Sequence, residues 1–168
     1  MSSPGQRTAP THNLPTLMNR FSLRALGALA FLLAAAPAFA QSSPAGCWQT
    51  IDDEDGTVKS YVKIYPEGNA LVGDIVRLTV DGGRCVDCAD GYDGRVLRNE
   101  RIMSGYTRDG NDYEGGRIID PKSGRTYKSV MKLVEGSNGN RLYLRGFVGI
   151  RALGRSQEWR RAAASNCN

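Results

Sequence analysis

Apolar and polar residues alternate in short stretches along this chain, beginning at residue 46. In residues 58–65, one face carries Val58, Ser60, Val62 and Ile64, and the other carries lysines and tyrosines. Successive side chains of a β-strand point to opposite faces, so this period of two is typical of a strand with one buried face. We therefore predict strands, and no helical period of useful length follows residue 40.

Eight such stretches are separated by links rich in Gly, Asp, Asn and Pro, the residues that accept turn backbone angles. Most links are short, which predicts antiparallel neighbours in chain order. The link at residues 79–100 is long and irregular, and we interpret it as a functional or disulfide-pinned loop. The predicted strands are 46–51, 58–65, 70–78, 101–107, 112–120, 126–134, 141–149 and 155–161.

Eight short antiparallel strands in chain order avoid exposed edges by closing into an up-and-down barrel, and a β-sandwich is the alternative. Two end features favour the barrel. Gly46 and Trp48 open the first strand, while Trp159 and Arg160 lie in the last, and closure makes these strands neighbours. We expect these four residues to be structural, with Arg160 or Arg161 stacked on the Trp48 indole.

The first forty residues resemble a targeting segment. Arg20 and Arg24 precede an apolar run over residues 25–36, and residues 38–40 (Ala-Phe-Ala) form a small-x-small cleavage site. We predict that residues 1–40 are a cleaved signal peptide and that the product is exported to the periplasm. Residues 41–168 are then one mature β-barrel domain.

The apolar run is also shorter than the roughly 20 residues that a membrane-spanning helix needs. No later stretch is as apolar, so we do not expect an integral membrane protein. Gln41 follows the cleavage site, and a cysteine there would have indicated a lipid anchor. An uncleaved N-terminal anchor is the alternative, because a long segment precedes Arg20. That segment also leaves open whether Met1 or Met18 is the true start.

Cleavage changes the charge and the candidate chemistry. Removing three leader arginines lowers the 22 basic residues to 19 against 17 acidic ones, so the net charge falls from +5 to +2. This balance gives no basic footprint for nucleic acid. The single histidine, His12, leaves with the leader, and histidine is the commonest general base and metal ligand. We expect no cofactor and no enzymatic activity, because no catalytic constellation remains.

Four cysteines lie in the mature part, and export would place them where disulfides persist. Four cysteines allow three pairings. The simplest joins Cys47 to Cys167, near the two ends of the domain, and Cys85 to Cys88, which are close in sequence. We predict this pairing and leave the other two open.

Four stretches together resemble a known family of exported bacterial proteins, domain of unknown function 2147 (DUF2147). They are residues 46–48 (GCW), 115–127 (GGRIIDPKSGRTY), 144–149 (LRGFVG) and 159–160 (WR). The resemblance spans essentially the whole mature chain and implies a lipocalin-like barrel with no established activity. The Cys85-x-x-Cys88 pair resembles a feature of many members, whereas Cys47 stands where members often carry another residue.

The Cys85-x-x-Cys88 motif is the one that is able to carry redox chemistry. Acidic residues surround it, including Asp87, Asp90 and Asp93, and negative charge raises a thiol pKa rather than lowering it. We therefore favour a structural disulfide over a thiol–disulfide enzyme. The same aspartates do not fit the calcium-binding EF-hand spacing, so we predict no metal site.

The leading function hypothesis is a periplasmic lipocalin-like protein that binds a small, largely apolar molecule in its interior or mouth. The alternative is a filled barrel that acts as an envelope structural or interaction protein, and a thiol–disulfide enzyme is the least favoured. Amphipathic tyrosines are the candidate ligand-binding residues, namely Tyr61, Tyr65, Tyr106, Tyr127 and Tyr143.

Overall fold

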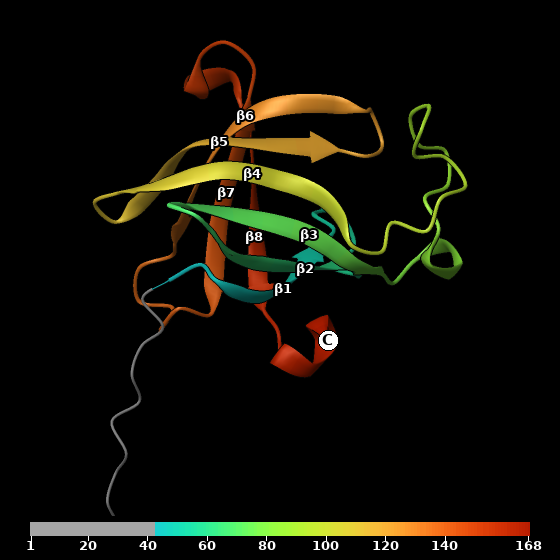
Figure 1. The fold of residues 1–168 in the computed structure, drawn as a ribbon, viewed down its shortest axis with the longest axis horizontal. Helices are drawn as coiled ribbons and strands as arrows, with labels where there is room; N and C mark the ends of the chain where they lie inside the picture. The colour runs from blue at the N-terminus through green and yellow to red at the C-terminus, as the bar shows by residue number, and fades with distance from the viewer. Residues whose placement is uncertain (1–42) are drawn as a thin grey trace, which may run out of the picture. The chain divides into compact units, whose positions relative to one another are not determined.

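A computed structural model describes residues 43–168, and the predicted signal peptide lies outside the described residues. Eight antiparallel strands, each paired with its neighbours in chain order, close into one barrel, which confirms the fold predicted from the sequence (Figure 1). The strands are β1 (Gly46–Ile51), β2 (Val58–Glu67), β3 (Ala70–Leu78), β4 (Glu100–Asp109), β5 (Asp112–Asp120), β6 (Arg125–Leu133), β7 (Arg141–Phe147) and β8 (Arg155–Arg161).

The largest departures from the predicted strand ends are at the ends of β2, β4 and β7. Strand β2 continues through Pro66 to Glu67, which pairs with Ala70, because Gly68 adopts a positive φ of 63° that allows a two-residue turn. The β4–β5 turn is equally tight, with Asp109 paired to Asp112. Strand β7 ends at Phe147, two residues earlier than predicted.

The barrel interior is filled by side chains of its own strands. In β2, Ser60, Val62 and Ile64 are buried, as the alternation predicts. Five interior side chains have no solvent-exposed surface at all: Trp48, Val62, Met103, Tyr106 and Leu142. A cavity large enough for water would expose part of its lining. The part of the core that these five residues form is therefore dry and packed.

The long link between β3 and β4 packs against the barrel. Leu97 in this link is 1% exposed and belongs to the hydrophobic core, together with Cys85. The link also contacts the β5–β6 turn, where the Ala89 amide donates to the Pro121 carbonyl (3.2 Å) and Lys122 donates to the Val86 carbonyl (2.5 Å). These contacts hold the link against the right-hand end of the barrel in Figure 1.

Both predicted disulfides are formed. Cys47 joins Cys167 across 120 residues, with 5.7 Å between their Cα atoms, and Cys85 joins Cys88 within the long link. Cys167 ends the short 3₁₀ helix η3 (Ala164–Cys167), which contacts β1 and β2. The first bond therefore fastens the segment after the last strand onto the first strand. Among residues 43–168, no helix has the length and apolarity needed to cross a membrane.

Candidate functional site

The five candidate tyrosines lie on both faces of the barrel wall. Tyr106 is in the interior, and Tyr127 shares its face of β6 with the buried Ser129. Tyr61, Tyr65 and Tyr143 alternate with buried neighbours and point outward. The structure therefore does not gather these tyrosines around one interior cavity.

Two of the outward tyrosines belong to surface networks. The Tyr65 hydroxyl donates to Asp74 (2.6 Å) and accepts from Arg101 (2.8 Å), and its bond to Asp74 raises its pKa. Arg101 also donates to Glu67 (3.2 Å), which completes a chain of side chains over β2, β3 and β4. Tyr61 lies under the Arg77 guanidinium, 4.5 Å from its ring centroid. These contacts explain both tyrosines as wall-stabilising residues.

Tyr143 lies in an outer depression of about 400 Å³ between β6 and β7, which Lys132, Arg145 and Arg151 also line. Its hydroxyl shares a hydrogen bond with the Ser156 hydroxyl (2.7 Å), which lowers the Tyr143 pKa, and the charge of Arg145 adds to this effect. The depression is basic and open to solvent. Such a surface attracts anions but does not enclose an apolar molecule.

Tyr106 is the polar centre of the interior. Its ring fills the space that a side chain at Gly116 would occupy, because an ideal Cβ there would lie 2.3 Å from the ring. Ser129 pairs with Gly116 on the adjacent strand. Neither the Tyr106 nor the Ser129 hydroxyl has a hydrogen-bond partner of normal geometry, although both are fully buried. Burial raises the Tyr106 pKa, because the charged phenolate would lose its hydration in the interior.

Tyr106→Phe should raise the free energy of unfolding at neutral pH by about 1 kcal/mol, because a buried hydroxyl without a partner costs about 1–3 kcal/mol. The gain should grow in alkali. The raised pKa keeps Tyr106 neutral in the folded state, whereas the unfolded chain ionises it above about pH 10, so wild type loses stability there. Urea unfolding of both proteins near pH 7 and pH 11 measures the difference. A variant that is clearly less stable than wild type would show that the hydroxyl has a partner.

One end of the barrel is closed by Arg161, which stacks on Trp48 with 4.2 Å between the guanidinium carbon and the ring centroid. Of the two arginines that the sequence offered for this stack, Arg161 makes it. Arg161 also donates to the carbonyls of Gly139 (2.6 Å), Ala45 (2.9 Å) and Ser43 (3.0 Å), and burial lowers its pKa. These bonds satisfy one backbone acceptor in the β6–β7 link and two in the segment just before β1.

The seam between β1 and β8 is short. Trp48 pairs with Arg161 and Gln49 with Arg160, and beside them the Ala162 amide donates to the Cys47 carbonyl (2.9 Å). A depression of about 440 Å³ lies beside the seam, lined by Ile51, Asp53 and Trp159 among others. The Arg155–Asp53 ion pair (2.8 Å) joins β8 to the β1–β2 link, and Arg160 also lines the depression.

Sequence reasoning missed an exposed apolar segment, residues 148–154, which we call the apolar loop. It joins β7 to β8 and contains the 3₁₀ helix η2 (Arg151–Leu153). Val148, Ile150 and Leu153 are 70%, 62% and 80% exposed. The signal was present in the sequence, because VGIRALG is far more apolar than the other short links. Its first two residues were instead predicted to be the end of the strand at 141–149.

The described residues contain no cluster of three or more side chains suited to hold a metal ion. The Cys85 and Cys88 thiols are joined in a disulfide, and the Cys88 amide donates to Asp93 (3.2 Å).

A bacterial protein family described as "Uncharacterized protein conserved in bacteria (DUF2147)" matches residues 46–161. The chain belongs to the DUF2147 family. The match runs from the first residue of β1 to the last residue of β8, so it covers the entire barrel of this DUF2147 protein.

Among solved structures, the DUF2147 barrel is similar to protein HP1028 from Helicobacter pylori, which is described as belonging to the lipocalin family. The TM-score is 0.57 at 16% sequence identity, over 73% of this chain and 85% of that chain. At this identity the similarity shows the fold, which is lipocalin-like. No curated protein matches the chain.

Proposed function

We propose that this DUF2147 protein is an exported envelope protein that acts through the outer surface of a filled, lipocalin-like barrel. The dry interior carries the proposal, since Trp48, Met103 and Tyr106 leave no exposed surface inside. A carrier of this fold needs an internal cavity for its ligand. The largest exposed apolar side chains lie outside instead, on the apolar loop.

Two features support export to the periplasm. Residues 1–40 have the charge and apolar pattern of a cleaved signal peptide. All four cysteines are paired in disulfides, which persist in oxidising compartments. We propose no enzymatic activity, because residues 43–168 contain no histidine and both thiols of the CxxC motif are consumed in a bond.

A second candidate is the binding of a small, largely apolar molecule inside the barrel. The unpartnered hydroxyls of Tyr106 and Ser129 favour it, because a ligand with one polar group would satisfy them. Met103 and Met131 belong to the same core and have flexible side chains that are able to move aside. This candidate requires the packed interior to open.

Native mass spectrometry of the protein released from the periplasm distinguishes the two functions and tests export. We expect the mass of residues 41–168 with two disulfides and no bound molecule. A mass that includes Ala40 and earlier residues would contradict cleavage at this site. A noncovalent adduct of constant mass, lost on unfolding and weakened by Tyr106→Phe, would overturn the filled-barrel proposal in favour of the small-molecule carrier.

A further inference from the structure

The apolar loop projects from the top of the barrel in Figure 1, away from the long β3–β4 link at the right. Val148, Ile150 and Leu153 expose most of their side chains there, although leaving apolar surface in water is unfavourable. Single exposed apolar residues are common, but three large ones within six residues form a patch, and patches of this kind mark interaction sites.

The apolar loop has a fixed conformation. Arg145 on β7 donates to the Arg151 carbonyl (2.8 Å) and to the Ala152 carbonyl (3.0 Å), so it satisfies two backbone acceptors near the tip. Gly154 packs so closely on β7 that a Cβ would lie 2.5 Å from the Gly146 carbonyl oxygen. The three apolar side chains therefore lie on a preformed turn. Two of its backbone carbonyls already accept hydrogen bonds from Arg145 before any partner binds.

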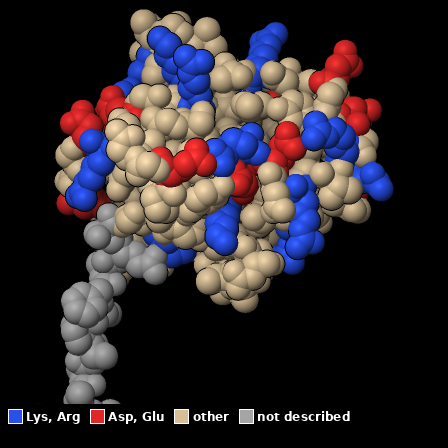
Figure 2. Space-filling model, in the orientation of Figure 1, with Lys and Arg blue, Asp and Glu red and all other residues tan. Residues whose placement is uncertain are grey.

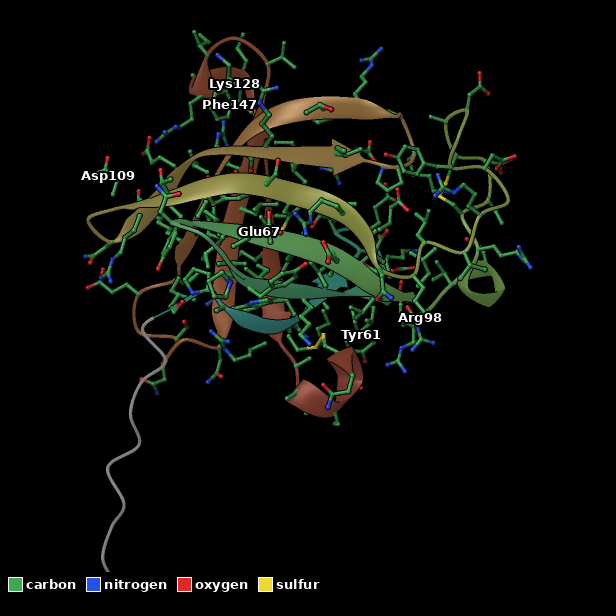
Figure 3. All side chains as sticks on the ribbon, in the orientation of Figure 1. Tyr61, Glu67, Arg98, Asp109, Lys128 and Phe147 are labelled. Carbon is green, nitrogen blue, oxygen red and sulfur yellow. A yellow bond between two sulfur atoms is a disulfide. The ribbon has the colours of Figure 1, made fainter. Side chains whose placement is uncertain are left out.

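Two cations lie in the row of strand residues that leads to the base of this loop. Arg117 and Lys128 face each other directly across β5 and β6, and Phe147 is the next residue in the same row on β7. Figure 3 shows Lys128 and Phe147 beside the loop. Like charges directly opposite each other destabilise a sheet. Among the described residues, neither Arg117 nor Lys128 has an acidic partner within salt-bridge distance.

Arg151 adds a further cation at the tip, 5.9 Å from the Phe147 ring centroid, and it pairs with Glu114 (3.0 Å). In Figure 2, Lys and Arg side chains lie on both sides of the uncharged surface at the top of the molecule. The surface therefore combines a protruding apolar tip with a positively charged base.

We propose that the apolar loop docks the protein on an anionic phospholipid surface, with Val148, Ile150 and Leu153 in the interfacial layer and Arg117 and Lys128 against the headgroups. This proposal rests on the proposed function, which acts through the outer surface of the barrel, and it names the partner of that surface. Apolar side chains bordered by cations are the chemistry that interfacial membrane anchors use.

The shape of the surface favours a bilayer over a protein partner. A specific protein interface buries about 800 Å² on each side over a broad complementary area. Three side chains on a protruding turn give much less, and the exposed Arg117 and Lys128 on the neighbouring strands are charged. A bilayer requires no complementary shape, because its interfacial layer adapts to a protruding tip.

Vesicle co-sedimentation of the protein purified from the periplasm tests the proposal. One set of vesicles is phosphatidylcholine alone, and the other is phosphatidylcholine mixed with phosphatidylglycerol. We expect binding to the anionic vesicles, weak binding to the neutral ones, and loss of binding in high salt. Equal binding to both sets, or no binding to either, overturns the proposal.

Two variants and two matched controls separate the apolar and basic parts. Ile150→Asp and the pair Arg117→Glu with Lys128→Glu should each weaken anionic-vesicle binding by about tenfold or more. The controls are Val96→Asp, at a residue 53% exposed on the long link, and Arg98→Glu, which Figure 3 places at the lower right, far from the apolar loop at the top. Both controls should bind like wild type, and circular dichroism verifies that all four proteins are folded.

The outcomes also separate this proposal from the function on which it rests. If no vesicles are bound and native mass spectrometry shows no small-molecule adduct, the membrane partner is wrong and the filled-barrel function stands. If an adduct is found, the filled-barrel function itself fails. If Ile150→Asp instead abolishes self-association seen by analytical ultracentrifugation, the loop is an interface between copies and the membrane proposal is overturned.

Discussion

Replacing both Cys47 and Cys167 by serine will lower the free energy of unfolding by about 4 kcal/mol. In the chain-entropy model, a bond that closes a loop of about 100 residues contributes near 4.7 kcal/mol, and loss of a native bridge typically costs 2–5 kcal/mol. The bond here joins residues 120 apart. It also fixes η3 beside β1, next to a seam at which only two residue pairs of β1 and β8 are in register. Urea unfolding followed by tryptophan fluorescence measures the loss.

The matched control is the pair Cys85→Ser with Cys88→Ser. These residues are only three apart, so their bond restricts the unfolded chain much less. We expect a loss well below that of the first pair. Equal losses from the two double variants would show that local packing, rather than restriction of the unfolded chain, determines the contribution of each bond.

Gly116→Ala will destabilise the barrel by about 3 kcal/mol, at the upper end of the usual cost of overpacking a core. The added methyl would lie 2.3 Å from the Tyr106 ring, which has no space into which to move because it is fully buried. Gly116 has no positive φ, so the cost comes from the clash and not from backbone strain. Thermal and urea unfolding both report the change.

Gly146→Ala is the control for this clash. Gly146 is also a strand glycine without positive φ, but the nearest atom to its ideal Cβ is at 3.5 Å, an ordinary contact. We expect a change below about 1 kcal/mol there. In a Tyr106→Ala background, which removes the ring, Gly116→Ala should lose most of its effect, because the two residues are in direct contact. A full loss in that background would contradict the clash.

Much of the fold was predictable because its signals are local. The alternation of apolar and polar residues predicted β2 and its buried residues Ser60, Val62 and Ile64. The turn residues indicated where most strands end. Closure followed from the need of eight strands to avoid edges, and the spacing of the cysteines suggested both bonds. Each of these inferences depends on residues near in sequence or on a general property of sheets.

The positions of the tyrosines were not predictable, because they depend on register. Ile102 and Met103 are adjacent in β4 and both are buried, which breaks the alternation. The pairing register shifts beside Gly73 and again between Tyr113 and Gly116. Each shift of one residue exchanges the inner and outer faces. No pattern in the sequence therefore placed Tyr106 inside.

The choice between Arg160 and Arg161 depended on register in the same way, since adjacent residues face opposite sides of the wall. The apolar loop was missed for a different reason. Val148 and Ile150 continue the strand period of β7, so alternation alone did not reveal that pairing ends at Phe147.

The Cys47–Cys167 bond makes the stability of this protein depend on the compartment in which it folds. Cys167 follows the last strand and Cys47 lies in the first, so the bond cannot close until all eight strands are on the same side of a membrane. On the proposed route of export, the reduced chain inside the cell lacks the Cys47–Cys167 bond. It therefore unfolds for translocation more readily than the oxidised protein would. Oxidation in the periplasm then closes the bond and stabilises the folded state. Because the chain would have to unfold to pass back through the membrane, the bond opposes its return to the cytoplasm.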